Sequence, residues 1–180
     1  MDNLFSANYR FLALYNRWLN QRVYTACEQL PEAVRQQDLG AFFGSIQHTL
    51  NHLMVGDQIW LQRFIATGAA HGVDFSALTQ VVQLPPGCTL DTQLYPDWAS
   101  LKARREQLDA AIETWLAEAP DDMASWTMAY TSMQGAPRQH PMWQALTHFF
   151  NHQTHHRGQV TTLLAQQGVD VGVTDLIALV

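Results

Sequence analysis

Hydrophobic residues return at helical spacing in four long segments of the chain, and this periodicity predicts four amphipathic helices. The expected helices cover residues 3–30, 39–66, 98–117 and 141–167. Pro31 ends the first helix, Thr67-Gly68 ends the second, and Gly168 follows the fourth at a position where helices commonly stop. Four such helices with modest connections predict an all-α fold, a four-helix bundle built by one domain over residues 1–180.

The connections between these helices carry a different pattern. Residues 72–96 contain several prolines and read as a loop. Residues 125–139 begin with a run of β-forming side chains, and Gly135 then suggests a turn. A short β-hairpin or an extended loop is therefore expected before the last helix. The tail, residues 169–180, is apolar but short, and we expect it to pack on the bundle as a strap.

Composition and charge narrow the classes of function. The chain has 180 residues, of which 47% are hydrophobic, and this is enough for one real core. Its net charge is −6 with only ten Lys and Arg, which argues against nucleic-acid binding. No apolar run reaches the roughly 18–20 residues that span a bilayer, and no signal-peptide pattern is seen. The two cysteines are far apart, so neither disulfides nor thiolate zinc sites are expected, and the sequence predicts a cytoplasmic protein.

The strongest chemical signal is a cluster of histidines in the fourth predicted helix. Four of the eight histidines fall within residues 148–156. With His148 set at 0° on an ideal helix, the apolar arc lies between about 60° and 160°. His156 falls inside this arc at about 80° and His152 at its edge at about 40°, whereas His148 and His155 fall outside it. His152 and His156 are thus the better inward pair, and His148 and His155 are better placed as flanking groups.

Two histidines one helical turn apart can reach a single metal ion, but they form only part of a site. Spacing alone also allows both to be packed core residues. The second predicted helix holds the other close pair, His48 and His52, and its apolar arc does not choose between them. A stripe of small residues on the face of His52 favours His52 weakly, because small side chains let a neighbour approach closely; these residues are Ser45, Thr49 and Gly56.

Asp57 falls near the middle of the apolar arc of the second helix. A buried carboxylate is costly unless it is paired. Asp57 could orient a ligand imidazole, but we favour a structural role in which it accepts a hydrogen bond from an Arg or Trp. His71 and His140 lie in predicted loops or at a helix edge, and no role is assigned to them.

Two motifs in the sequence resemble the signatures of the DinB family. Residues 45–53, followed by Asp57 and Trp60-Leu61, are similar to its second-helix signature, and residues 151–159 are similar to its fourth-helix signature. The resemblance covers essentially the whole chain and implies a DinB/YfiT-like four-helix bundle that is usually dimeric. It also implies a divalent metal held by three histidines, one from the second helix and two from the fourth. Carried over by motif, these are His52, His152 and His156, with His48 as an extra histidine.

Three neutral imidazoles would leave a coordination position open, as in a catalytic site. A bound water would become acidic there, and a bound thiol would ionise. Members of the wider superfamily resemble thiol-dependent transferases and isomerases. The leading hypothesis is therefore a metal-dependent enzyme that activates a low-molecular-weight thiol toward a small electrophilic substrate. Imidazole ligands suit several metals, and zinc or nickel is expected.

Other functions remain open at this point. One alternative is metal-assisted hydrolysis, in which an activated water attacks a carbonyl or phosphoryl group. Another is a metal-binding stress-response protein without catalytic activity. The simplest is a helical bundle whose histidines only pack in the core and bind no metal. A homodimer is expected from the resemblance alone. Phe11 and Trp18, beside the main stripe of the first helix, could offer a partner surface.

Overall fold

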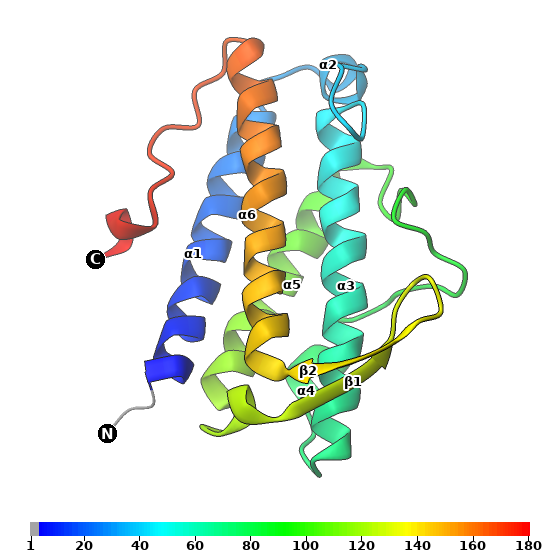
Figure 1. Ribbon diagram of the computed structural model, residues 1–180. Coiled ribbons are helices and arrows are strands. Elements are labelled where there is room, and N and C mark those ends of the chain that lie inside the picture. Colours follow the sequence, from blue (N-terminus) through cyan, green and yellow to red (C-terminus); the bar gives the residue numbers. More distant parts are fainter. Residues whose placement is uncertain (1–3) are drawn as a thin grey trace.

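The computed structural model describes residues 4–180, and four long helices form its body (Figure 1). Residue 3, where the first helix was expected to begin, lies outside the described range. The long helices are α1 (Leu4–Cys27), α3 (Ile46–Ala70), α5 (Trp98–Glu118) and α6 (Met142–Gln166). α1 packs beside α5 and α6, and α3 packs beside α6. The predicted all-α four-helix fold is confirmed.

The second long helix begins later than the sequence pattern predicts. Gly44 has a φ of 73°, and Ser45 then caps α3 by accepting a hydrogen bond from the backbone N–H of His48 at 3.1 Å. Residues 39–45 are therefore a turn, and Phe42, expected on the apolar face, is 85% exposed. α3 also runs past residue 66, to Ala70.

The first long helix ends earlier than expected, at Cys27, and a short helix follows Pro31, α2 (Glu32–Gln36). The loop predicted over residues 72–96 contains one helical turn, α4 (Ser76–Thr79), and is otherwise irregular. This loop is tied to α3 by Asn51. The side chain of Asn51 accepts from the Tyr95 N–H at 2.8 Å and donates to the Tyr95 carbonyl at 3.0 Å. The tie holds the loop over the end of α3 that carries the histidines.

A two-stranded antiparallel hairpin precedes the last helix, as predicted. Its strands are β1 (Thr127–Thr131) and β2 (Pro137–Pro141), and a 3₁₀ turn, η1 (Met123–Ser125), leads into it. Tyr130 pairs with Arg138 and Met128 with His140. β2 runs directly into α6, so that Pro141 is the cap residue of α6 rather than part of its first turn. The hairpin crosses α3 and leads into the start of α6 (Figure 1).

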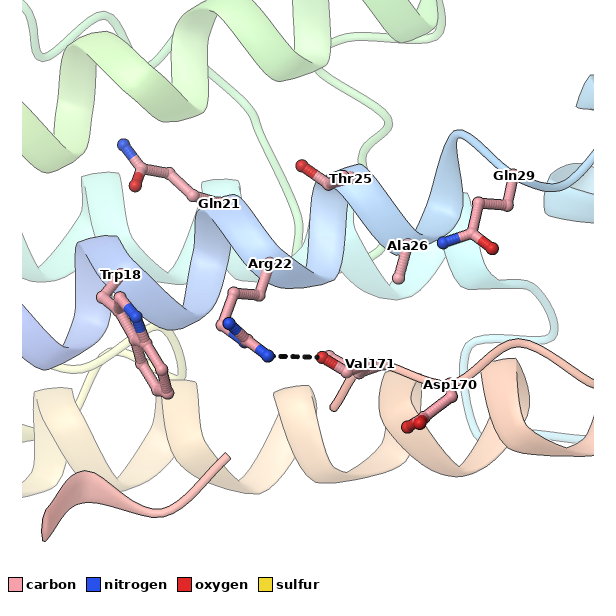
Figure 2. Close-up of a pocket in the computed structure, with 8 residues that line it drawn as sticks. All are labelled: Trp18, Gln21, Arg22, Thr25, Ala26, Gln29, Asp170 and Val171. Carbon is pink, nitrogen blue, oxygen red and sulfur yellow. Dashed lines mark hydrogen bonds between the residues drawn. The ribbon is translucent and has the colours of Figure 1, made fainter. Parts of the chain in front are cut away.

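The tail packs along the bundle as expected. Val169 is buried, the Tyr15 hydroxyl donates to the Thr174 carbonyl at 2.7 Å, and the tail ends in η2 (Leu176–Leu179). An open pocket lies between α1 and the tail, where Arg22 donates to the Val171 carbonyl at 3.2 Å (Figure 2). None of the residues that line this pocket is a histidine.

Surface features bear on two further expectations. Within residues 4–180, no helix combines the length and the apolar character that crossing a membrane requires. Phe11 and Trp18 of α1 are half-buried, and Leu14 between them is 53% exposed. The homodimer stays a prediction, which light scattering of the purified protein would test.

Candidate metal centre

Three histidines from two helices converge at one point of the bundle. A ring nitrogen from each of His52 on α3 and His152 and His156 on α6 lies within 4.8 Å of the other two. The Nε2 atoms of His52 and His152 are 3.2 Å apart. Two imidazoles bound tetrahedrally to one ion place their nitrogens about 3.3 Å apart, given metal–nitrogen distances of about 2.0–2.1 Å. The separation therefore fits a shared divalent ion.

Hydrogen bonds at the far side of two rings leave their Nε2 atoms free. The Nδ1 of His52 is 3.0 Å from the Leu90 carbonyl, and the Nδ1 of His156 is 2.8 Å from Gln159 Oε1. Because a carbonyl oxygen can only accept, each Nδ1 carries the proton and each Nε2 keeps its lone pair. Such an outer hydrogen bond orients the imidazole and increases its basicity toward a metal.

The ring of His152 is positioned by packing rather than by an outer hydrogen bond. A Cβ placed on Gly56 of α3 would lie 2.9 Å from His152 Cε1, so the ring rests directly against the backbone of α3. Its Nδ1 is buried and has no hydrogen-bond partner among residues 4–180. Gly56, one residue of the stripe of small side chains on α3, thus admits an imidazole from the neighbouring helix. His152 is half-buried, and its Nε2, which faces the Nε2 of His52, is the ring nitrogen that would bind an ion shared with His52.

The cluster is electrically neutral at physiological pH. Burial, with a smaller contribution from the neighbouring imidazoles, lowers the pKa of His152 to about 3. Burial also lowers the pKa of His156 to about 4 and that of His52 below its ordinary value. The Phe43 ring stacks on His52 at a centroid distance of 3.9 Å and helps to exclude water. Neutral imidazoles are the form that binds metals.

The lowered pKa values make the metal-free protein less stable in acid. The unfolded imidazoles take up protons below about pH 6.5, whereas folded His156 and His152 have pKa values of about 4 and about 3. The unfolded chain binds more protons than the folded protein in this pH interval. The contribution of His152 and His156 to the free energy of unfolding is therefore complete above pH 6.5 and is lost as the pH falls. Between pH 6.5 and pH 5, each of these histidines lowers the free energy of unfolding by at most about 2 kcal/mol. Urea unfolding at several pH values measures the slope, and a His152→Ala variant with an unchanged slope would contradict it.

The remaining histidines lie outside the cluster. His48, on the same helix as His52, points to the loop, where its Nε2 is 3.1 Å from the Asp91 carbonyl. His148 and His155 flank the cluster, with ring centroids 5.9 Å from His152 and 4.8 Å from His156, respectively. His71 and His140 pack instead on the aromatic rings of Trp126 and Tyr130.

Asp57 is fully buried, and both of its carboxylate oxygens accept hydrogen bonds. Arg105 Nη1 of α5 donates to Oδ2 at 2.5 Å, and Gln153 Nε2 of α6 donates to Oδ1 at 2.9 Å. The structural interpretation of Asp57, as an acceptor for an arginine, is confirmed. Gln153 directly follows His152 in the sequence, so this contact also fixes α6 beside the cluster.

The hydrogen bonds of Asp57 belong to a buried polar network that reaches all four long helices. Asp109 pairs with Arg105 at 2.7 Å and accepts from Asn16 and Asn20 of α1 at 3.1 and 3.0 Å. Arg157 of α6 donates to both asparagines. Burial lowers the pKa of Arg157 to about 10, so it stays charged at neutral pH. Two carboxylates therefore balance two guanidinium groups in the interior.

Most of the groups that support the cluster were not predicted from the sequence. The outer acceptors, the Leu90 carbonyl and Gln159, carried no signal beyond the proximity of Gln159 to His156. The network residues left a weak signal, since Asn16 and Asn20 are one turn apart on α1 and Arg105 and Asp109 one turn apart on α5. Polar pairs at that spacing within apolar stripes could have indicated a buried network.

Comparisons with known proteins identify a family and a relative. A family model described as the DinB family matches residues 5–179. The chain is 25% identical over 165 residues to Protein DinB of Bacillus subtilis (strain 168), which covers 89% of this chain and 87% of that relative. No solved structure gives a significant match.

Proposed function

The chain belongs to the DinB family, and we propose that its three-histidine cluster is the metal centre of an enzyme that activates a low-molecular-weight thiol. The observation that carries the proposal is the convergence of His52, His152 and His156, with two of the Nε2 atoms freed by outer hydrogen bonds. The substrate that receives the thiol would be a small electrophile.

The metal would supply Lewis acidity at neutral pH, lowering the pKa of a bound thiol or water. His52, His152 and His156 would hold it, and three protein ligands leave a position for a further group. The chain's own residues keep these ligands neutral, oriented and partly shielded from water by Phe43. Zinc or nickel suits three imidazoles, and we propose one of these two ions.

The engagement of Asp57 by other groups favours a thiol over water as the activated group. A hydrolase of this kind commonly needs a general base to take a proton from water. Asp57, the buried carboxylate five residues after His52, has both oxygens engaged by Arg105 and Gln153. A thiol is already far more acidic than water, so ionisation at a metal requires less help from a protein base.

The proposal predicts thiol-dependent turnover by the metal-loaded protein. Protein loaded with zinc or nickel would be incubated with glutathione and an electrophile such as 1-chloro-2,4-dinitrobenzene, and conjugate formation would be followed by absorbance. We expect a rate at least about tenfold above that of the His152→Ala variant, which loses one ligand. The His48→Ala variant is the matched control, because His48 contacts the loop and not the cluster.

Three other results would contradict the proposal in different ways. Equal rates for wild type and His152→Ala would show that the cluster does not activate the thiol. A product formed in the absence of any thiol would favour metal-assisted hydrolysis. Stoichiometric, tightly held metal without turnover of either kind would favour a metal-binding protein without chemistry.

A further inference from the structure

A group of aromatic and cationic side chains lies where the hairpin crosses α3 and leads into α6, next to the three-histidine cluster but not part of it. We call it the arginine–aromatic patch, and its residues are Trp60, Arg63, Tyr130, Arg138, His140 and His148. The Cζ of Arg63 lies 4.7 Å from the Trp60 ring centroid and 4.3 Å from that of Tyr130. Two aromatic rings therefore hold the guanidinium, and these contacts account for its position without any acidic partner.

The positive charge of this patch is not compensated. Eight of the ten Lys and Arg side chains donate to a carboxylate, a carbonyl or a side-chain amide. The two exceptions among residues 4–180 are Arg63 and Arg138, and no ion pair of the described chain includes either of them. In a chain of net charge −6, two unpaired arginines at one place form a local site of the opposite sign.

The hairpin register brings the two arginines to the same tyrosine. Arg138 of β2 is the direct cross-strand partner of Tyr130 in β1, and partners in a ladder project from the same face. That face also carries Met128, which is fully buried, so it is turned toward the helices. Arg63 contacts the Tyr130 ring from α3. Tyr130 thus contacts Arg63 and has the exposed Arg138 as its cross-strand partner, and the His140 Nε2 is 3.4 Å from its hydroxyl.

A row of rings joins the patch to the three-histidine cluster. The His148 ring centroid is 4.8 Å from that of Trp60 and 5.9 Å from that of His152. His148 lies one helical turn before His152 on α6, and Arg63 lies one turn beyond Trp60 on α3. A single small molecule of extended shape could therefore contact Arg63 at one end and the cluster at the other.

We propose that the arginine–aromatic patch binds the carboxylate of a small-molecule substrate whose reactive end lies at the three-histidine cluster. A guanidinium presents a planar fork of N–H donors that matches a carboxylate. The side chain of Arg63 donates no hydrogen bond to any of residues 4–180, so these donors are available. Partial burial of Arg63 strengthens the attraction, since less water competes for its donors. Two cations are too few for nucleic acid, which requires many phosphate contacts. The assignment of the reactive end rests on the proposed function, but anion binding by the patch does not.

The first experiment tests the patch without any metal. Metal-free protein labelled with ¹⁵N would be titrated with hexanoate and, as a neutral match, with 1-hexanol, while the side-chain signals of Arg63 and Trp60 are followed by NMR. We expect hexanoate but not hexanol to shift the Arg63 Nε–H signal. We expect Arg63→Gln to weaken hexanoate binding at least about fivefold, as for the loss of a charge-assisted pair, and Arg63→Lys to weaken it less. Arg17→Gln, which changes the net charge equally on α1, should bind as wild type does.

The second experiment tests whether one molecule contacts both the arginine–aromatic patch and the three-histidine cluster. Cobalt-loaded protein would be titrated with 6-mercaptohexanoate and with 6-mercaptohexanol, and the thiolate-to-cobalt charge-transfer band would report binding. We expect the carboxylate compound to bind about five- to tenfold more tightly in wild type, and this preference to disappear in Arg63→Gln.

The outcomes separate the two proposals. Hexanoate that fails to shift Arg63, or that binds Arg63→Gln as well as wild type, overturns the anion site. Equal affinities of wild type for the two thiols, unchanged in Arg63→Gln, overturn the placement of the carboxylate and leave thiol activation standing. No band with either thiol contradicts thiol activation, and the metal-free titration then still decides whether the patch binds carboxylate.

Discussion

Replacing Asp57 with alanine is expected to lower the free energy of unfolding of the metal-free protein by about 3 to 5 kcal/mol. The substitution leaves Arg105 buried with one carboxylate instead of two, and it removes the acceptor of Gln153. Truncating one partner of a buried ion pair destabilises the protein by far more than the net stability that the intact pair contributes. The reason is that the remaining charge stays buried without a partner. The loss would be a large share of a total stability of about 5 to 15 kcal/mol.

A surface ion pair of similar length provides the matched control. Arg17 donates to Glu113 at 2.7 Å, but the Arg17 side chain is 44% exposed. Glu113→Ala should therefore cost no more than about 1 kcal/mol. Urea unfolding followed by circular dichroism would measure both variants. Similar losses for Asp57→Ala and Glu113→Ala would show that the buried network does not hold the four helices together.

The second large effect concerns the space that Gly56 leaves for His152. Gly56→Ala is expected to reduce the affinity of the protein for zinc or nickel by about 10- to 100-fold. The new methyl group would come within 2.9 Å of His152 Cε1, and the imidazole is the part that must move, because the helix backbone is fixed by its own hydrogen bonds. Competition against a chromophoric chelator would give the affinity.

Gly158 of α6 is the natural control for this change. Like Gly56 it lies inside a long helix, but a Cβ at Gly158 meets no atom of the described residues within 4 Å apart from its chain neighbours and the nearby backbone of α6. Because alanine favours the helix over glycine, Gly158→Ala should raise the free energy of unfolding by up to about 1 kcal/mol. It should leave the metal affinity unchanged. If Gly56→Ala and Gly158→Ala bind metal equally well, the ring of His152 is not held in place by the backbone of α3.

Much of the fold follows from local patterns that the sequence displays. Apolar periodicity predicted four long helices, and β-forming residues around Gly135 predicted the hairpin. The start of α3 was predicted too early because Phe42 continues the apolar spacing. The positive φ of Gly44 and the cap at Ser45 override that spacing. The residue at which α3 begins depends on a few backbone torsion angles, and the hydrophobic pattern gives no information about them.

The histidine cluster was more predictable than the groups around it. Helical angles separate His152 and His156 from His148 and His155, because all four lie on one helix and share its geometry. The choice of His52 over His48 needed the neighbouring helix, and the stripe that ends at Gly56 gave only a weak indication. In the structure the ring of His152 lies against Gly56, at the end of that stripe.

Contacts between distant elements could not be predicted from one sequence. The Leu90 carbonyl faces His52 because Asn51 ties the loop to α3, and every residue of the loop offers a similar carbonyl. The pairing of Asp57 with Arg105 likewise depends on the rotation of α5 against α3. An apolar stripe fixes such a rotation only to within a broad arc.

Metal content of the purified protein tests the central claim most directly. Wild type, His52→Ala and His48→Ala would be made without a histidine tag, loaded with zinc or nickel, desalted and analysed for metal by mass spectrometry. The three-histidine centre predicts about one ion per chain in wild type and His48→Ala, and loss of most of the metal in His52→Ala. Full occupancy in both variants, or loss of metal from His48→Ala alone, would contradict it.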